Sequence, residues 1–151
     1  MARTRRAPAA PQRLILDSGA VIALSRNDQR ARAVLTAARE AGVEVTVPSV
    51  VVAEIVRGSA ADAPVNRVLE AVGEVDVADE ATGRIAGGLL GAASSAATVD
   101  AVVVATAVQV AGGVILTGDP TDLGPLADGH PEVVIQVVHR LTGAAATRRR
   151  Q

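Results

Sequence analysis

Several carboxylates in this sequence interrupt apolar runs, where a charge is costly unless it has a partner. The set is Asp17, Glu54, Asp100, Asp119 and Asp122. Asp17 directly follows the run LIL, and Asp119 follows VILTG. Glu54 and Asp100 stand in the segments VVVAEIVRG and TVDAVVVATA, which have helical character. If these regions converge in the fold, their oxygen atoms form a site for a hard cation.

Each carboxylate also has an ordinary structural explanation. Asp17 suits a helix N-cap, and Asp100 suits the positively polarised first turn of a helix. Glu54 can pair with Arg57, and a turn around Pro120 accounts for the two later acids. These separate structural roles explain the whole set of acids much less well, because four independent coincidences would have to place them at one edge of one fold.

A convergence of acids needs a neutralising cation. Two carboxylates about 4 Å apart repel by about 4 kcal/mol at an effective dielectric constant of about 20. The chain has no Lys, and Arg is scarce between its ends. We therefore expect Mg²⁺, or alternatively Mn²⁺, which prefer carboxylate and water ligands. Such ions polarise phosphoryl oxygens and activate water, and they suit a polyanionic substrate.

The elements that must position these acids alternate between strand and helix patterns. We expect strands at residues 13–16, 43–47, 74–78, 114–117 and 133–138. We expect helices at residues 18–26, 27–42, 48–58, 64–72, 79–95 and 98–113. Short continuous apolar strands separated by helices predict an α/β fold with a parallel sheet of about five strands flanked by helices. Ligands of such sheets bind beyond the carboxyl ends of the strands, where Asp17 and Asp119 fall.

Composition narrows the function further. The 151 residues indicate one domain, and they include no aromatic residue, no Cys and two His. Stacking of bases on aromatic rings, disulfides, thiol nucleophiles and cysteine zinc sites are therefore excluded. We find neither a secretory h-region nor an apolar run that resembles a membrane span, so we expect a cytoplasmic protein without a membrane partner.

Charge is distributed unevenly along the chain. From Leu14 to His139 there are seven Arg and all 16 acids, a balance of −9. The ends hold the other Arg residues: Arg3, Arg5, Arg6, Arg13, Arg140, Arg148, Arg149 and Arg150. We expect a domain at 13–140 with flexible Arg-rich tails at 1–12 and 143–151. These tails either contact a polyanion or only improve solubility.

Four segments together resemble the PIN-domain proteins, and specifically the VapC-type toxins of bacterial toxin–antitoxin pairs. They are LILDSGAVIAL, VPSVVVAEIVRG, TVDAVVVATA and GGVILTGDPTDL, in the right order over about residues 13 to 139. The resemblance implies a PIN-like three-layer fold and a metal-dependent endoribonuclease. It implies catalytic, metal-binding acids at Asp17, Glu54, Asp100 and Asp119, supported by Asp122, Ser18 and Thr117.

The resemblance also implies an RNA substrate, a homodimer, and a small antitoxin that covers an apolar groove. Two departures from the pattern are visible. Leu123 stands where many relatives have Phe, and the extension MARTRRAPAAPQ is longer than the usual start. Neither departure removes an acid.

Two other function classes remain open on the sequence. One is a catalytically silent PIN-like module that acts by binding a partner. The other is a HAD-like phosphatase or phosphotransferase, which also has an Asp after its first strand. That class requires a second Asp two residues later, where this chain has Gly19, and it requires a Lys.

Overall fold

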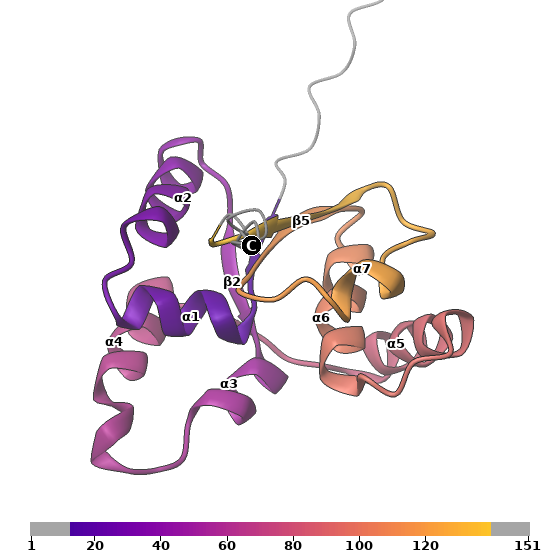
Figure 1. Ribbon diagram of the computed structural model, residues 1–151, viewed down its shortest axis with the longest axis horizontal. Helices are drawn as coiled ribbons and strands as arrows, with labels where there is room; N and C mark the ends of the chain where they lie inside the picture. The colour runs from indigo at the N-terminus through magenta and orange to yellow at the C-terminus, as the bar shows by residue number, and fades with distance from the viewer. Residues whose placement is uncertain (1–12, 140–151) are drawn as a thin grey trace, which may run out of the picture.

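The computed structural model describes residues 13–139 (Figure 1). Its strands are β1 (Arg13–Leu16), β2 (Val45–Pro48), β3 (Val75–Asp76), β4 (Gly113–Thr117) and β5 (Val133–Val137). Its α-helices are α1 (Ser18–Ser25), α2 (Gln29–Glu40), α3 (Ser49–Ile55), α4 (Ala63–Val72), α5 (Glu80–Ala93), α6 (Thr98–Gln109) and α7 (Leu123–Leu126). A short 3₁₀ helix, η1 (Ala60–Asp62), precedes α4.

The five strands form one parallel sheet in the order β3-β2-β1-β4-β5, which confirms the predicted fold class. In its register, Ile15 of β1 lies between Thr46 of β2 and Ile115 of β4. The carboxyl ends of β1 and β4 are therefore neighbours, since Leu16 pairs with Leu116. This pairing brings together the loops that carry Asp17 and Asp119.

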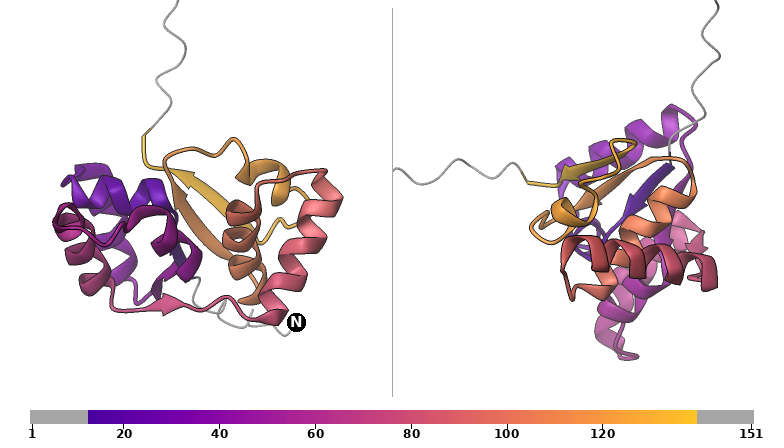
Figure 2. Two further views of the ribbon diagram at one scale, coloured as in Figure 1. Left: turned by 90° about the horizontal axis from the view of Figure 1, so that it is seen from below. Right: turned by 90° about the vertical axis from the view of Figure 1, so that its right-hand side faces the viewer.

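The sheet is the middle of three layers. Figure 1 shows α1, α2 and α4 on one side of it and α5, α6 and α7 on the other, and the left view of Figure 2 shows β4 and β5 between them. Ile15, Leu16 and Leu116 are fully buried in the sheet. In α6 every residue from Ala101 to Ala107 is buried, so this helix is apolar on all sides rather than amphipathic.

Helix starts follow the sequence closely at three positions and depart from it at one other. Asp17 caps α1 and Asp28 caps α2, both through their side-chain oxygens. The later apolar helix begins at Thr98, as its predicted range 98–113 indicates, and Ala97 occupies the cap position without a side-chain hydrogen bond. Pro48 ends β2, because its extended backbone pairs with Asp76 of β3.

The helix predicted for 48–58 is shorter than expected. It ends at Ile55, after which Val56 is extended and Gly58 has a φ of +79°. The next N–H groups donate to the side chain of Asp62 rather than continuing the helix. A buried carboxylate therefore ends α3, which residue periodicity alone does not indicate.

The Arg-rich tails predicted at 1–12 and 143–151, and Arg140, lie outside the described residues. Between residues 13 and 139, no single helix has the length and apolar character needed to cross a membrane. The bent pair α5 and α6, which meet at 117°, passes that test jointly on length and composition alone.

Candidate acidic site

A hollow of about 200 Å³ opens at the carboxyl edge of the sheet. Its walls come from the loops after β1 and β4 and from the first turn of α6: Asp17, Ser18, Gly19, Asp100, Thr117, Gly118, Asp119 and Asp122. Four of the five acids singled out in the sequence therefore face one space. Glu54 does not line it.

Asp17 is held rigidly at the base of this hollow. It is 5% exposed, and its backbone N–H continues the β1–β4 pairing by donating to the Leu116 carbonyl at 3.0 Å. One carboxylate oxygen accepts the Ser18 N–H at 2.8 Å, and the other accepts the Thr117 hydroxyl at 2.9 Å. Asp17 thus caps α1 and also presents its remaining lone pairs at the sheet edge.

Thr117 connects the two loops. Its hydroxyl lies 2.9 Å from an Asp17 oxygen and 3.1 Å from both the N–H and the carbonyl of Asp119. A hydroxyl has one hydrogen, so it donates to the charged Asp17 and accepts from the Asp119 N–H. The orientation of Asp17 therefore depends on the loop after β4.

The same two loops touch through their glycines. A Cβ atom on Gly19 would lie 2.7 Å from the Gly118 nitrogen and 2.9 Å from its Cα. No side chain fits at residue 19 without moving backbone. The acid that a HAD-like phosphatase needs at this position has no room, which counts against that alternative.

Asp100 shows that the carboxylates interact strongly. It is half-buried in the first turn of α6. Burial, followed by the charges of neighbouring carboxylates, raises the pKa of Asp100 to about 6. The contributing neighbours, in decreasing order of effect, are Asp17, Asp122, Glu54 and Asp119. A pKa this high means that the site is short of positive charge.

Glu54 stands beside the hollow, near the end of α3, and its side chain is exposed. Partial removal of water from its carboxyl group, and next the charge of Asp17, raise its pKa, while the Ser18 side chain and Arg57 act in the opposite direction. The alternative that Glu54 simply pairs with Arg57 is not what the structure shows, because the ion pairs within 4.0 Å among residues 13–139 do not include this one.

The carboxylate of Asp119 is partly occupied by hydrogen bonds within its own turn. One Asp119 oxygen accepts both the hydroxyl of Thr121 at 2.6 Å and its N–H at 3.0 Å. These contacts, the hydroxyl first, lower the pKa of Asp119. Asp119 therefore also stabilises its own turn, as the sequence allowed.

The donor set fits a hard divalent cation in its chemistry. It offers carboxylate oxygens and hydroxyls, with no sulfur or imidazole in the walls of the hollow. Within the described part of the chain, however, no three acidic or imidazole side chains are already close enough together to hold an ion. The arrangement therefore suits Mg²⁺ that keeps several of its water molecules, since that ion dehydrates reluctantly.

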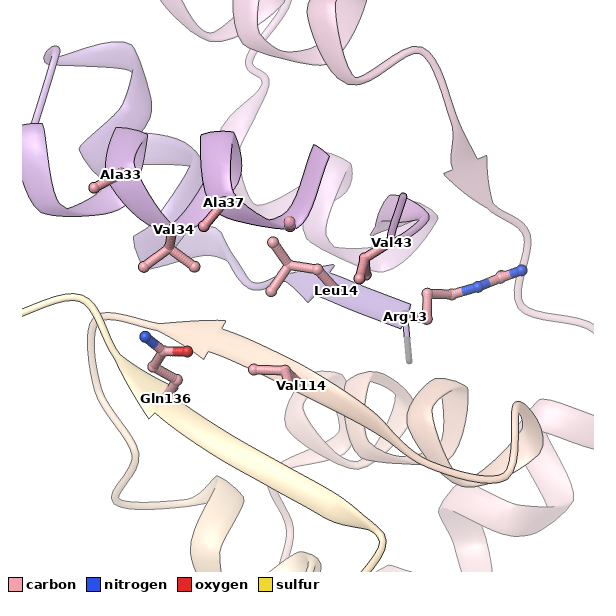
Figure 3. Close-up of a pocket in the computed structure, with 9 residues that line it drawn as sticks. Arg13, Leu14, Ala33, Val34, Ala37, Val43, Val114 and Gln136 are labelled. Atoms are coloured by element: carbon pink, nitrogen blue, oxygen red, sulfur yellow. The ribbon is translucent and has the colours of Figure 1, made fainter. Parts of the chain in front are cut away.

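A roomier hollow, about 420 Å³, lies away from these acids (Figure 3). Its walls are aliphatic side chains of α2 and of the sheet, including Val34, Leu14 and Val114, with Gln136 on β5. Arg13 at its rim extends toward β3, where it bonds to Asp76 at 3.3 Å. This hollow contains no acid, base or nucleophile suited to catalysis, so the smaller acidic hollow is the candidate site.

Sequence reasoning missed two parts of this arrangement. The Gly19–Gly118 contact has no periodic signal, although a Gly in each strand-end loop was a visible hint. Asp62 was not singled out, because it lies in the polar segment SAADAP rather than in an apolar run.

Fold and site together define an open parallel α/β protein with an acidic hollow at the carboxyl edge of its central strands. Residues 14–121, more than half of the chain, match the PIN domain family. The chain belongs to the PIN domain family. No curated protein matches it.

Several solved structures share this fold at low sequence identity. VapBC2 from Rickettsia felis, bound to a promoter DNA fragment, is 10% identical with a TM-score of 0.65, over 82% of this chain and 97% of that one. DNA-bound VapBC from Salmonella typhimurium is 15% identical with a TM-score of 0.63, over 85% and 99%. A toxin–antitoxin complex from Klebsiella pneumoniae is 19% identical with a TM-score of 0.61, over 80% and 95%.

Proposed function

We propose that this protein is a Mg²⁺-dependent endoribonuclease and the toxin of a toxin–antitoxin pair. The observation that carries the proposal is that Asp17, Asp100, Asp119 and Asp122 line one hollow, where burial and then the neighbouring carboxylates raise the pKa of Asp100. A site with that much negative charge is suited to a divalent cation and, through it, to a phosphodiester. Membership of the PIN domain family and the likeness to toxin–antitoxin structures support the same reading.

In this proposal Asp17 and Asp100 hold the ion, and Glu54 contributes directly or through water. Thr117 and Ser18 fix the two oxygens of Asp17, so that the site needs little reorganisation on binding. A bound Mg²⁺ supplies neutralisation of the acids and a lowered pKa for a water molecule that hydrolyses the RNA backbone. Asp100, with its pKa near 6, must lose its proton before the site is complete.

For the fourth acid we propose Asp122 ahead of Asp119. The charge of Asp122 acts more strongly on Asp100 than that of Asp119, and one oxygen of Asp119 is occupied by Thr121. Asp122→Asn should then lower cleavage more than Asp119→Asn. The reversed order in kcat assigns the principal role to Asp119, as the family pattern implies, and equal losses refute the preference for Asp122.

RNA cleavage by the purified protein tests the proposal. The wild type should cleave RNA with Mg²⁺ and lose this activity with a chelator, and Asp17→Asn should abolish it while the protein stays folded. Asp128→Asn, which removes an exposed acid outside the hollow, is the matched control. Full activity of folded Asp17→Asn refutes the mechanism. Calorimetric Mg²⁺ binding without cleavage of any RNA favours the silent binding module instead.

The antitoxin would bind in a groove between α1, α2 and α4. Its walls are the apolar side chains Leu24, Leu35, Pro64, Val68 and Ala71, bordered by Arg32 and Arg67. Apolar walls with two cations suit an amphipathic, acidic segment. If the adjacent gene encodes a small antitoxin, Leu35→Glu should abolish its co-purification with this protein while leaving RNA cleavage intact. The homodimer stays a prediction, which sedimentation of the isolated protein tests.

A further inference from the structure

We infer that Arg57 binds a phosphate of the RNA backbone beside the acidic hollow. The inference rests on the proposed function and names a substrate-binding residue that the acidic set does not include. Between residues 13 and 139 there are eight Arg and 16 acids, so most of the described surface repels RNA. An RNA-binding protein with this excess of negative charge needs a local cation for the phosphates.

Arg57 lies close to Glu54, beside the hollow. Its charge acts on Glu54, whereas every charge that acts on Asp100 is negative. It follows Glu54 by three residues, just after α3, and its guanidinium donates to the carbonyl of Ala53, the residue before Glu54, at 3.0 Å. A phosphate bound beside Glu54 is therefore within the field of Arg57.

The guanidinium group is available for such a contact. The Arg57 side chain is exposed and takes part in none of the ion pairs found among residues 13–139. One terminal nitrogen donates to the carbonyls of Ala53 and Val56, at 3.0 and 3.1 Å. The other N–H donors of the guanidinium fork are left for an anion, and a phosphate accepts two of them side by side.

The backbone at Arg57 is held in place by hydrogen bonds from three consecutive N–H groups to one carboxylate. The buried carboxylate of Asp62 accepts the N–H of Arg57 at 3.0 and 3.2 Å, of Gly58 at 2.7 Å and of Ser59 at 3.1 Å. This clamp holds residues 57–59 to the start of α4. An Arg on a fixed backbone loses less freedom when it binds a ligand than one on a mobile loop.

Binding of an uncleaved RNA by the full chain tests the inference. In the Asp17→Asn background, Arg57→Gln should weaken binding of a short single-stranded RNA about tenfold. It should also reduce the slope of log affinity against log salt by about 0.7, the value for one phosphate contact on a single strand. Arg57→Lys keeps the charge and loses the fork, so it should keep the salt slope with an intermediate affinity.

Arg84→Gln is the matched control. It removes the same charge from an exposed position on α5. Near Arg84, Thr82 donates a hydrogen bond to Gln109, which is the last residue of α6, whereas Asp100 is in the first turn of that helix. This variant should bind RNA nearly as the parent does. Equal affinities and equal salt slopes for Arg57→Gln and Arg84→Gln overturn the inference.

A second comparison separates contact with RNA from an effect through Glu54. If Arg57 touches the phosphate, Arg57→Gln weakens RNA binding equally in a Glu54→Gln background. If its effect disappears there, Arg57 acts only on Glu54, and the inference is wrong. If the wild type binds RNA at Arg57 but cleaves none, the proposed nuclease fails and the contact stands. If no RNA binds at all, both fail.

Discussion

Asp100→Asn should make the metal-free protein more stable while removing its activity. The shift in pKa of Asp100 from about 3.8 to about 6 corresponds to about 3 kcal/mol of unfavourable interaction for the charged form. Solvent screening at a half-buried position reduces this to about 1–2 kcal/mol. Loss of a charge from the first turn of α6 costs roughly 0.3–1 kcal/mol of helix-dipole interaction. A net gain of about 1 kcal/mol remains.

The raised pKa of Asp100 determines how the free energy of unfolding changes with pH. The folded protein binds a proton at Asp100 up to a higher pH than the unfolded chain does, because the folded pKa is raised. The contribution of Asp100 to the stability of the wild type therefore falls as pH rises from about 4 to about 6, and not above that range. Asp100→Asn should match the wild type near pH 4 and exceed it at neutral pH.

Thermal unfolding in a chelator, followed by far-UV circular dichroism, measures the difference. A gain of about 1 kcal/mol corresponds to a rise in Tm of roughly 2–4 °C for a chain of this size. Mg²⁺ should then stabilise the wild type more than the variant. Glu70→Gln on α4 is the control for simple loss of negative charge. A variant that is less stable than the wild type at neutral pH, or a difference unchanged between pH 4 and 7, refutes the reasoning.

Two further substitutions test the loops that form the site, and a third tests a close contact away from it. Gly19→Ala should separate these loops, because its Cβ overlaps the Gly118 backbone. We expect the free energy of unfolding, measured in urea, to fall by about 1–3 kcal/mol, together with a marked loss of RNA cleavage. Thr117→Val leaves an oxygen of buried Asp17 without its donor and should cost about 1–3 kcal/mol, with weaker Mg²⁺ binding by calorimetry. Gly112 has a φ of +114°, and a Cβ added there would lie 2.6 Å from the carbonyl oxygen of Glu132. Gly112→Ala should therefore lower Tm without a selective effect on the acidic site, and an unchanged Tm would contradict this.

The fold could be predicted largely because its strands are continuous apolar runs. RLIL and VILT are read directly as β1 and the body of β4, and their adjacency explains why Asp17 and Asp119 share one hollow. The predicted strand at 74–78 was too long, because β3 contains only Val75 and Asp76. An edge strand pairs on one side only, so its length depends on its neighbour rather than on its own residues.

The site was harder to predict where geometry rather than residue type decides. The sequence allowed Glu54 to line the hollow, but Glu54 lies near the end of α3 and outside the walls of the hollow. That end depends on Asp62, five residues beyond Arg57, whose clamp no periodic pattern reveals. Likewise the alternatives for Asp17, helix cap or site residue, were never exclusive, because its two oxygens have different partners.

The hydrogen bond between Thr117 and Asp17 joins residues that are 100 positions apart in the chain. Asp17 therefore leaves the ribosome 100 residues before Thr117 does. Closing so long a loop is slow and depends on completed pairing of β1 with β4. A nascent chain therefore carries Asp17 long before Thr117 is available to orient its carboxylate.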